Sequence, residues 1–401
     1  GIVIDRLSGK SSFATLQGQG TLEAGTLTAN ADLDKLVAEL GRFVDWTGID
    51  LAGKLDSEVQ WQRGPASAFT AVADARVQNF QLAAPGLLPW QEQNLQIHAE
   101  AKGQADSTNI QQISQAEFQV LSGSDKLFAK LQQPVSNLST TGSWPLAYTL
   151  EGDLATWLPR LQSFVPLAGW QISGDIVAEG GGEFSTVRAA IAPTKVTLKE
   201  FVAASQEYYI REPKVVLETA GTLDLEKRLF TSSSTTFASS ALAFRADELK
   251  AAFGSEGVSL SGHVEYRAKL EVLSSFLGAP QYPRTWQFGG DVVGGADAAM
   301  QNGMVQANFT TEIENLSYAS RTSAARPAGV AVSPAAATAQ WQVAWSEPKV
   351  TLSGEGSFDP KQDKLELRSA RLDSAALALA AAGKVEQVSG QCLTALAGEI
   401  N

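Results

Sequence analysis

The sequence predicts a mainly β protein: an elongated, curved antiparallel sheet, an open β-groove, built from tandem repeats that each carry one short amphipathic helix. Three observations lead to this prediction. Similar segments recur at intervals of about 120 residues, apolar and polar residues alternate over long stretches, and helical spacing replaces the alternation once per repeat. Alternation with period two indicates strands that are buried on one face and solvated on the other.

The repeats are recognised by anchors that keep one register. Leu33, Leu154 and Leu270 lie in similar helical segments, 121 and 116 residues apart. Self-similarity at a nearly fixed period is typical of repeat architectures, in which neighbouring copies stack to bury a shared core. The same two spacings separate the glycines of three matching strand segments, Gly53, Gly174 and Gly290.

The second halves of the repeats also match. Glu212-Pro-Lys-Val-Val-Leu and Glu347-Pro-Lys-Val-Thr-Leu lie 135 residues apart, so the third repeat carries an insertion. The insertion is placed at 320–339, where Pro and small residues predict a surface loop. We expect one continuous elongated domain. It consists of 1–29, the end of a preceding repeat; 30–148, repeat 1; 149–265, repeat 2; 266–388, repeat 3; and 389–401, the start of a further repeat.

Strands are expected wherever the alternation is clear. Val215 and Leu217 share one face of such a segment, and Val216 and Glu218 share the other. Turn residues such as Gly180-Gly-Gly182 separate the segments, which predicts about five or six strands per repeat. The chain starts without an initiator Met or a signal-like segment, so we expect a section of a longer protein.

One short helix per repeat is predicted by a change of period. Leu33, Leu36 and Leu40 follow helical spacing, and Asp32 can cap this helix as Asp153 can cap the second. Such a short helix must dock its apolar stripe on another surface. Two interpretations are open: the helix covers an edge of the sheet, or it contacts lipid. The polar faces of the helices contain few Lys or Arg residues, which weakens the second interpretation.

Composition and motifs exclude several function classes. A count of 31 Lys and Arg against 43 Asp and Glu, a net charge of −12, argues against nucleic-acid binding. Hydrophobic residues make up 44%, so the chain folds. One cysteine, Cys392, and two separated histidines, His98 and His263, provide no metal site and no catalytic cluster. We expect no enzyme and no cofactor.

Three Gly-x-x-Asp segments end at Asp106, Asp224 and Asp359. Carboxylates at such positions can bind calcium or act in catalysis. Each of them lies between two predicted strands, however, and Asp bonds its own backbone in turns. A turn role is therefore the simpler interpretation.

The combined pattern resembles a known superfamily. Helix starts such as Gly152-Asp-Leu154, strand segments such as Asn79-Phe-Gln-Leu82 and Asn315-Leu-Ser-Tyr318, and the turn Leu352-Ser-Gly-Glu-Gly356 carry the resemblance. They are similar to the AsmA/TamB superfamily of bacterial envelope proteins, relatives of the repeating-β-groove, bridge-like lipid-transfer proteins. The resemblance covers nearly the whole chain, although the membrane anchor and C-terminal domain of such proteins are not in this sequence.

The resemblance implies a non-catalytic segment that binds and conducts phospholipids between the inner and outer membranes. The location implied is the periplasm and cell envelope, with the full-length protein anchored in a membrane. The implied partners are phospholipid acyl chains and envelope membrane proteins at the ends of the full-length chain, with no nucleic acid. Twelve side chains are predicted to line the groove: Leu51, Phe80, Leu95, Ile97, Ile172, Phe201, Val215, Leu217, Phe288, Leu316, Val350 and Leu352.

Three alternatives stay open at the level of sequence. Alternating strands also fit a closed sandwich core without a ligand. A second possible function is an assembly scaffold that offers a sheet edge to strands of outer-membrane proteins. A third is a structural β-repeat protein at the cell surface.

Overall fold

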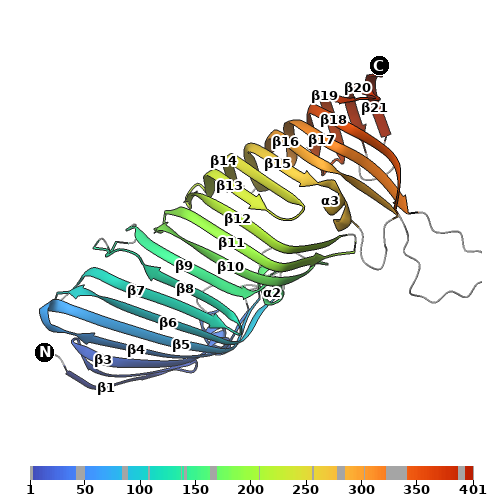
Figure 1. Cartoon of the computed structure of the whole chain (residues 1–401). Helices are drawn as coiled ribbons and strands as arrows, with labels where there is room; N and C mark the ends of the chain where they lie inside the picture. Colours follow the sequence, from blue (N-terminus) through green and yellow to red (C-terminus); the bar gives the residue numbers. More distant parts are fainter. Residues whose placement is uncertain are drawn as a thin grey trace, which may run out of the picture. The chain divides into compact units, whose positions relative to one another are not determined.

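A computed structural model describes most of the chain (Figure 1). Two compact units make up the protein: unit 1, Gly1–Phe201, and unit 2, Val202–Asn401. The boundary falls within one strand. The described residues are 3–41, 50–83, 89–106, 109–136, 138–139, 142–162, 169–206, 208–254, 257–277, 285–301, 303–321, 341–386 and 393–400.

In unit 1 the strands pair antiparallel in the order of the chain from β1 to β10. A short 3-10 turn, Pro65–Ser67, joins two of them. The elements are β1 Val3–Lys10, β2 Ala14–Thr21, β3 Ala24–Asp32, α1 Leu33–Leu40, β4 Asp50–Arg63, β5 Ala68–Ala83, β6 Trp90–Ala105, β7 Ile110–Ser122, β8 Asp125–Leu131, β9 Trp144–Asp153, α2 Leu154–Gln162, β10 Gln171–Phe184 and β11 Arg188–Ala204.

Unit 2 repeats this arrangement, and β12 to β21 again pair antiparallel in sequence order. The elements are β12 Tyr209–Asp224, β13 Leu229–Ala238, β14 Leu242–Gly254, β15 Gly257–Lys269, α3 Leu270–Phe276, β16 Trp286–Gln301, β17 Met304–Arg321, β18 Trp341–Asp359, β19 Lys364–Ser374, β20 Ala378–Glu386 and β21 Leu393–Ile400.

The predicted fold class is confirmed. The described residues form mainly strands, and six strands lie between α1 and α2 and another six between α2 and α3. The helices begin where the sequence places them. The Asp32 carboxylate accepts a hydrogen bond from the Lys35 backbone N–H at 3.3 Å, and Asp153 accepts one from Ala155 at 2.8 Å. Both carboxylates satisfy amide groups that the first helical turn leaves without an intrahelical partner.

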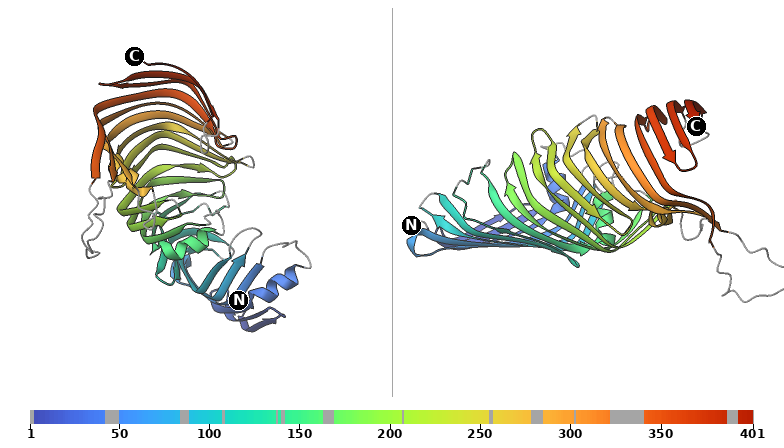
Figure 2. Two further views of the ribbon diagram at one scale, coloured as in Figure 1. Left: turned by 90° about the vertical axis from the view of Figure 1, so that its right-hand side faces the viewer. Right: turned by 45° about the horizontal axis from the view of Figure 1, so that its top comes forward.

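The sheets are curved and open. In unit 2 the strands arch, and α3 lies under the arch (Figure 2). Leu270 of α3 packs against Val292, Ile313 and Val350. Among the described residues, the large apolar side chains of Phe118, Leu260 and Phe288 are 39%, 40% and 38% exposed. No large side chain among the described residues is fully buried. These values oppose the closed sandwich core, in which the inner side chains of two sheets cover each other.

The same irregularity occurs in each repeat. Gly53 on β4 has φ +130°, and Asn79 on the neighbouring strand has φ +50°. The β4–β5 register shifts here, so two residues of β5 face one of β4, which is a β-bulge. A Cβ on Gly53 would lie 3.0 Å from the Gln78 carbonyl oxygen, so a side chain has little room. Gly174 with Glu200, and Gly290 with Asn315, repeat the pair of positive φ angles.

The predicted insertion at 320–339 falls almost wholly outside the described residues. Its first two residues, Ser320 and Arg321, are not loop residues, because they end β17 and pair with Gln342 and Trp341 of β18. The strand alternation therefore continues further than the Pro-rich composition suggests.

Candidate functional site

Unit 1 has one apolar and one polar face. Side chains of directly paired residues in an antiparallel sheet point to the same face. Leu55, Val77 and Leu95 form one such row across β4–β6. We call the face that carries these rows the apolar face. A second row on it crosses β5 to β10 without a charged residue and consists of Ala75, Ile97, Val120, Leu127, Leu150 and Ala178.

Unit 2 has an apolar face of the same kind. Its buried centre is Val292, Ile313 and Val350, which pair directly across β16–β18. The next row crosses β12 to β20 without a charged residue. It consists of Leu217, Phe237, Phe244, Tyr266, Gly294, Thr311, Leu352, Leu372 and Leu379.

The structure brings several of the predicted lining residues together. Leu316 and Leu352 pack against the cluster that contains Val350, and Leu217 begins the long row of unit 2. Val215 is buried two residues before Leu217 on β12. In unit 1, Leu95 and Ile97 lie in adjacent rows of the apolar face.

Other predicted residues lie at the bulges or beyond them. Leu51 pairs with Leu82 past Gly53, and the Phe80 ring meets Trp90 at a centroid distance of 5.1 Å. Phe201 comes directly after Glu200 at the second bulge, and Ile172 lies two residues before Gly174. Phe288 lies outside the buried cluster of unit 2 and is exposed.

Sequence reasoning missed a charged network that ties α2 to the sheet. The Arg160 guanidinium of α2 donates hydrogen bonds to Glu92 on β6 and Asp125 on β8, including one of 3.1 Å from Nη2 to Glu92 Oε2. Ser122 also donates to Glu92, and the Trp90 indole N–H donates to it at 2.6 Å. The network lies against the apolar face, because Asp125 pairs with Ser122 in the row that contains Leu95.

The hydrogen bonds keep both carboxylates ionised. Burial opposes ionisation of Glu92, but the bonds from Arg160, Ser122 and Trp90 outweigh it and lower the pKa of the carboxyl. The pKa of Asp125 is lowered in the same way, against burial, by the Asp153 backbone N–H and then by Thr156 and Arg160. The pKa of Arg160 is raised: burial acts to lower it, and the two carboxylates outweigh burial.

A repeated glutamate accompanies this network. Glu92, Glu212 and Glu347 are all buried and come shortly before matching apolar strand segments. The Glu212 carboxylate accepts hydrogen bonds from the backbone N–H groups of Ser240, at 2.9 Å, and Ala241, at 3.2 Å. The matching Glu-Pro-Lys segments could have indicated this role from sequence, whereas nothing local points to Arg160.

Tyrosines bridge the apolar face over glycines. The Tyr148 hydroxyl lies 2.8 Å from Thr194 Oγ1, and a Cβ on Gly180 would meet both side chains. In unit 2 the Tyr266 hydroxyl bonds to Thr311 across Gly294. Gly294 leaves space for the Tyr266 ring, and Gly180 leaves space for the Tyr148 hydroxyl and Thr194.

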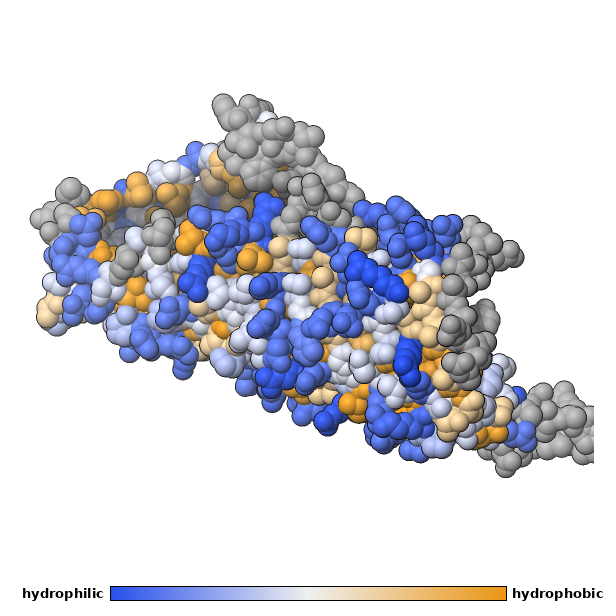
Figure 3. All heavy atoms as spheres, turned by 90° about the horizontal axis from the view of Figure 1, so that it is seen from above, coloured by the Kyte–Doolittle hydropathy of each residue, from blue (hydrophilic) through white to orange (hydrophobic). Residues whose placement is uncertain are grey.

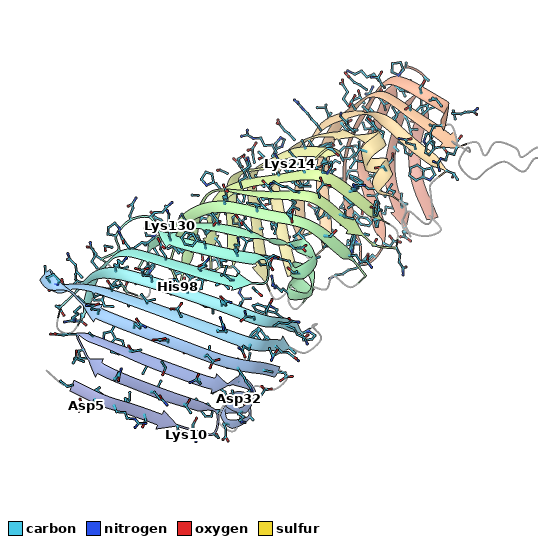
Figure 4. All side chains as sticks on the ribbon, turned by 60° about the horizontal axis from the view of Figure 1, so that its bottom comes forward. Asp5, Lys10, Asp32, His98, Lys130 and Lys214 are labelled. Carbon is cyan, nitrogen blue, oxygen red and sulfur yellow. The ribbon has the colours of Figure 1, made fainter. Side chains whose placement is uncertain are left out.

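The polar face carries rows of charged and polar side chains. In unit 1 Glu58, Asp74 and His98 pair in one row, and His98 Nδ1 lies 2.8 Å from Asp74 Oδ1. His98 is labelled on β6 in Figure 4. A shallow cavity of about 650 Å³ on this face is lined by these residues together with Asn30 and Asp56. The side of the molecule seen in Figure 3 is dominated by hydrophilic residues with hydrophobic ones between them.

His263 forms the corresponding pair in unit 2, with Nδ1 2.8 Å from Asp297 Oδ1. This hydrogen bond raises the pKa of the imidazole. Both histidines are thus partnered side chains of the polar face. Cys392 lies outside the described residues. Within the described ranges no group of three His, Cys, Asp or Glu side chains could hold a metal ion.

The turn interpretation of the three Gly-x-x-Asp segments is confirmed. Asp224 accepts from the Lys227 backbone N–H at 2.9 Å, and Asp106 accepts from that of Asn109 at 2.7 Å. Asp359 accepts from the N–H of Lys361 at 2.9 Å. Each carboxylate thus bonds a backbone N–H two or three residues farther along the chain.

The fold and the two faces define the class of protein. It is a repeat-built, open antiparallel sheet whose apolar face carries long rows without a charged residue. No protein-family model matches the chain, and neither does any curated protein or solved structure. No helix in the part of the chain that the structure describes is long and apolar enough to cross a bilayer.

Proposed function

We propose that this chain is a non-catalytic hydrophobic-groove segment of a bacterial cell-envelope protein. Its apolar face binds phospholipid acyl chains and conducts lipids between the inner and outer membranes. The observation that carries the proposal is the uncharged row from Leu217 to Leu379, which crosses β12 to β20. A surface of this extent on an open sheet needs a hydrophobic occupant, because large exposed apolar patches are rare on monomeric proteins.

The accessibility of the face supports the proposal. Phe118 and Leu260 belong to apolar rows, yet 39% and 40% of their surfaces are exposed. An acyl chain laid over such residues gains about 0.8 kcal/mol per buried methylene. Neighbouring rows have similar composition, so a lipid moving from one row to the next crosses between sites of similar affinity. Transport along the face needs no catalytic residue.

The test introduces a charge on each face in turn. Ile97→Glu and Leu352→Glu place a carboxylate on the apolar face of unit 1 and of unit 2. Gln96→Glu and Thr351→Glu are matched controls, since each changes the neighbouring residue, which points to the polar face. Fluorescent phospholipid transfer between vesicles and co-purified lipid by mass spectrometry are measured, and circular dichroism checks folding.

A conduit predicts that the apolar-face variants lose lipid and transfer while the controls keep both. An assembly scaffold that pairs strands through an edge tolerates all four changes. A wild-type chain that carries no phospholipid and takes up none from vesicles contradicts the proposal and favours a structural role.

A further inference from the structure

Aromatic side chains gather at one end of β16, β17 and β18. We call the group Trp286, Phe288, Tyr318, Trp341 and Trp345 the aromatic end. The rings of Trp286 and Phe288 lie 5.5 Å apart between centroids, and those of Phe288 and Tyr318 lie 5.4 Å apart. Trp345 pairs with Tyr318 across β17–β18, on the face that carries Phe288. Trp341 pairs with Arg321, three residues after Tyr318, and so points to the opposite face at the same end of the strands. The group lies beyond the third bulge, at Gly290 and Asn315.

The aromatic end of β18 is much more exposed than the middle of the same strand. Trp341 is 40% exposed, Trp345 47% and the intervening Val343 65%, whereas Val350 farther along β18 is 2% exposed. The pairing of β18 with β19 begins only at Val350. Among the described residues, Trp341–Ser346 therefore pairs with β17 alone.

The chemistry of the aromatic end fits the interfacial region of a bilayer. Trp and Tyr combine an apolar ring with a polar N–H or O–H, and they are enriched where acyl chains meet headgroups. The Arg321 guanidinium lies over the Trp341 ring, 5.2 Å from its centroid, and supplies a cation for a phosphate group. One stacked cation is not a polybasic patch, so the surface suits neutral as well as anionic lipid.

Through Trp345 and Tyr318 the aromatic end is also continuous with the apolar face. Leu316, two residues before Tyr318, packs against Val292, Ile313 and Val350. An acyl chain that leaves a bilayer at Trp345 could therefore meet Tyr318 and Leu316 in turn, and then the buried centre of unit 2.

From these observations we propose that the aromatic end inserts into the interfacial region of a phospholipid bilayer and is where lipid enters or leaves the apolar face of unit 2. This inference rests on the proposed function and adds the place and the lipid region of exchange. Because the contact is aromatic and not polybasic, it should be little affected by salt.

The experiment is flotation of the chain with neutral phosphatidylcholine vesicles. Trp341→Ser/Trp345→Ser is expected to weaken vesicle binding at least about tenfold, which corresponds to about 1.4 kcal/mol. Leu22→Ser/Val293→Ser is the matched control, since it removes two other exposed apolar side chains, and it should bind like wild type. Trp341→Tyr/Trp345→Tyr keeps interfacial aromatics and should retain most of the binding.

A second measurement separates this inference from the proposed function. Phospholipid delivered from detergent, without a bilayer, should load the Trp341→Ser/Trp345→Ser variant as fully as wild type, because the buried centre of unit 2 and the row from Leu217 to Leu379 are unchanged. Two results would refute the entry site while leaving the proposed function standing. In the first, wild type takes up phospholipid from detergent but does not float with vesicles; in the second, the Trp341→Ser/Trp345→Ser variant floats as well as wild type. A dimer that the serine substitutions dissociate would assign the aromatic end to a second copy of the chain and overturn the inference.

Discussion

Removing the positive charge of α2 should destabilise unit 1 strongly. Arg160→Met keeps the length and apolar stem of the side chain but leaves Glu92 and Asp125, which are 8% and 7% exposed, without their cation. Breaking a buried ion pair from one side typically costs about 3–5 kcal/mol. The Arg160 side chain is 18% exposed, so water reaches part of the site, and we expect about 3 kcal/mol, the lower end of that range.

The assay is urea unfolding followed through a probe placed in unit 1. Arg76→Met, which replaces an exposed arginine of the polar face, is the control and should change the free energy of unfolding by less than about 0.5 kcal/mol. Arg160→Met/Glu92→Gln/Asp125→Asn removes all three charges and should recover most of the lost stability, because no unpaired charge stays buried.

The pH dependence gives an independent check. The pKa values of Glu92 and Asp125 are lowered in the folded protein, so their contribution is fully present above their ordinary values, near pH 4, and is lost as the pH falls through the folded values. In Arg160→Met the buried carboxyls bind protons more readily, so the deficit of the variant should shrink on acidification. If Arg160→Met lowers the free energy of unfolding by less than about 1 kcal/mol, and this loss does not vary with pH, this prediction is refuted. Arg160 would then form only solvated surface ion pairs with Glu92 and Asp125.

Three further predictions concern single features of the sheet. Gly53→Ala should lower the free energy of unfolding by about 1–3 kcal/mol, because it places a Cβ at a strained positive φ. Gly64 has φ −107° and more space around it, so the control Gly64→Ala should be nearly neutral in the same thermal unfolding assay. Tyr148→Phe should cost about 1 kcal/mol through loss of one hydrogen bond, measured by chemical unfolding, and an unchanged stability would mean that the hydroxyl is solvated. Asp297→Asn should lower the pKa of His263 in an NMR titration; in wild type this raised pKa stabilises the fold at low pH, and the effect is lost as the pH rises through the folded value.

The helices show what local pattern can predict. Asp32 and Asp153 were recognisable as caps, and the spacing of Leu33 and Leu36 was recognisable as helical, because both depend on residues within one or two turns. Alternation at Val215 and Leu217 predicted one face of β12 for the same reason. The residues involved lie within a few positions of one another along the chain, so their spacing in the sequence is enough to predict these features.

The candidate site was only partly predictable. The alternation identifies which residues share a face, but not whether a second layer covers that face, and the open surface of the sheets answers this question. Phe288 was predicted to line the groove because the repeat register matches it with Leu51 and Ile172. In the structure it is exposed, and the bulge at Gly290 separates it from the buried cluster. A bulge shifts the register of one strand against its neighbour, and residue spacing along one strand does not reveal that shift.

By itself the sequence determined the class of fold. Apolar residues that recur every second position predict the strands, and a local change to a spacing of about 3.6 residues predicts one short helix per repeat. The interval of about 120 residues between matching segments predicts the number of repeats. Only the tertiary structure decided which side chains meet across strands. Arg160 reaches Glu92 across 68 positions of sequence and Asp125 across 35, and Trp345 is exposed because β19 does not extend beside it. Such contacts depend on strand register and on where each strand ends, which the fold as a whole determines.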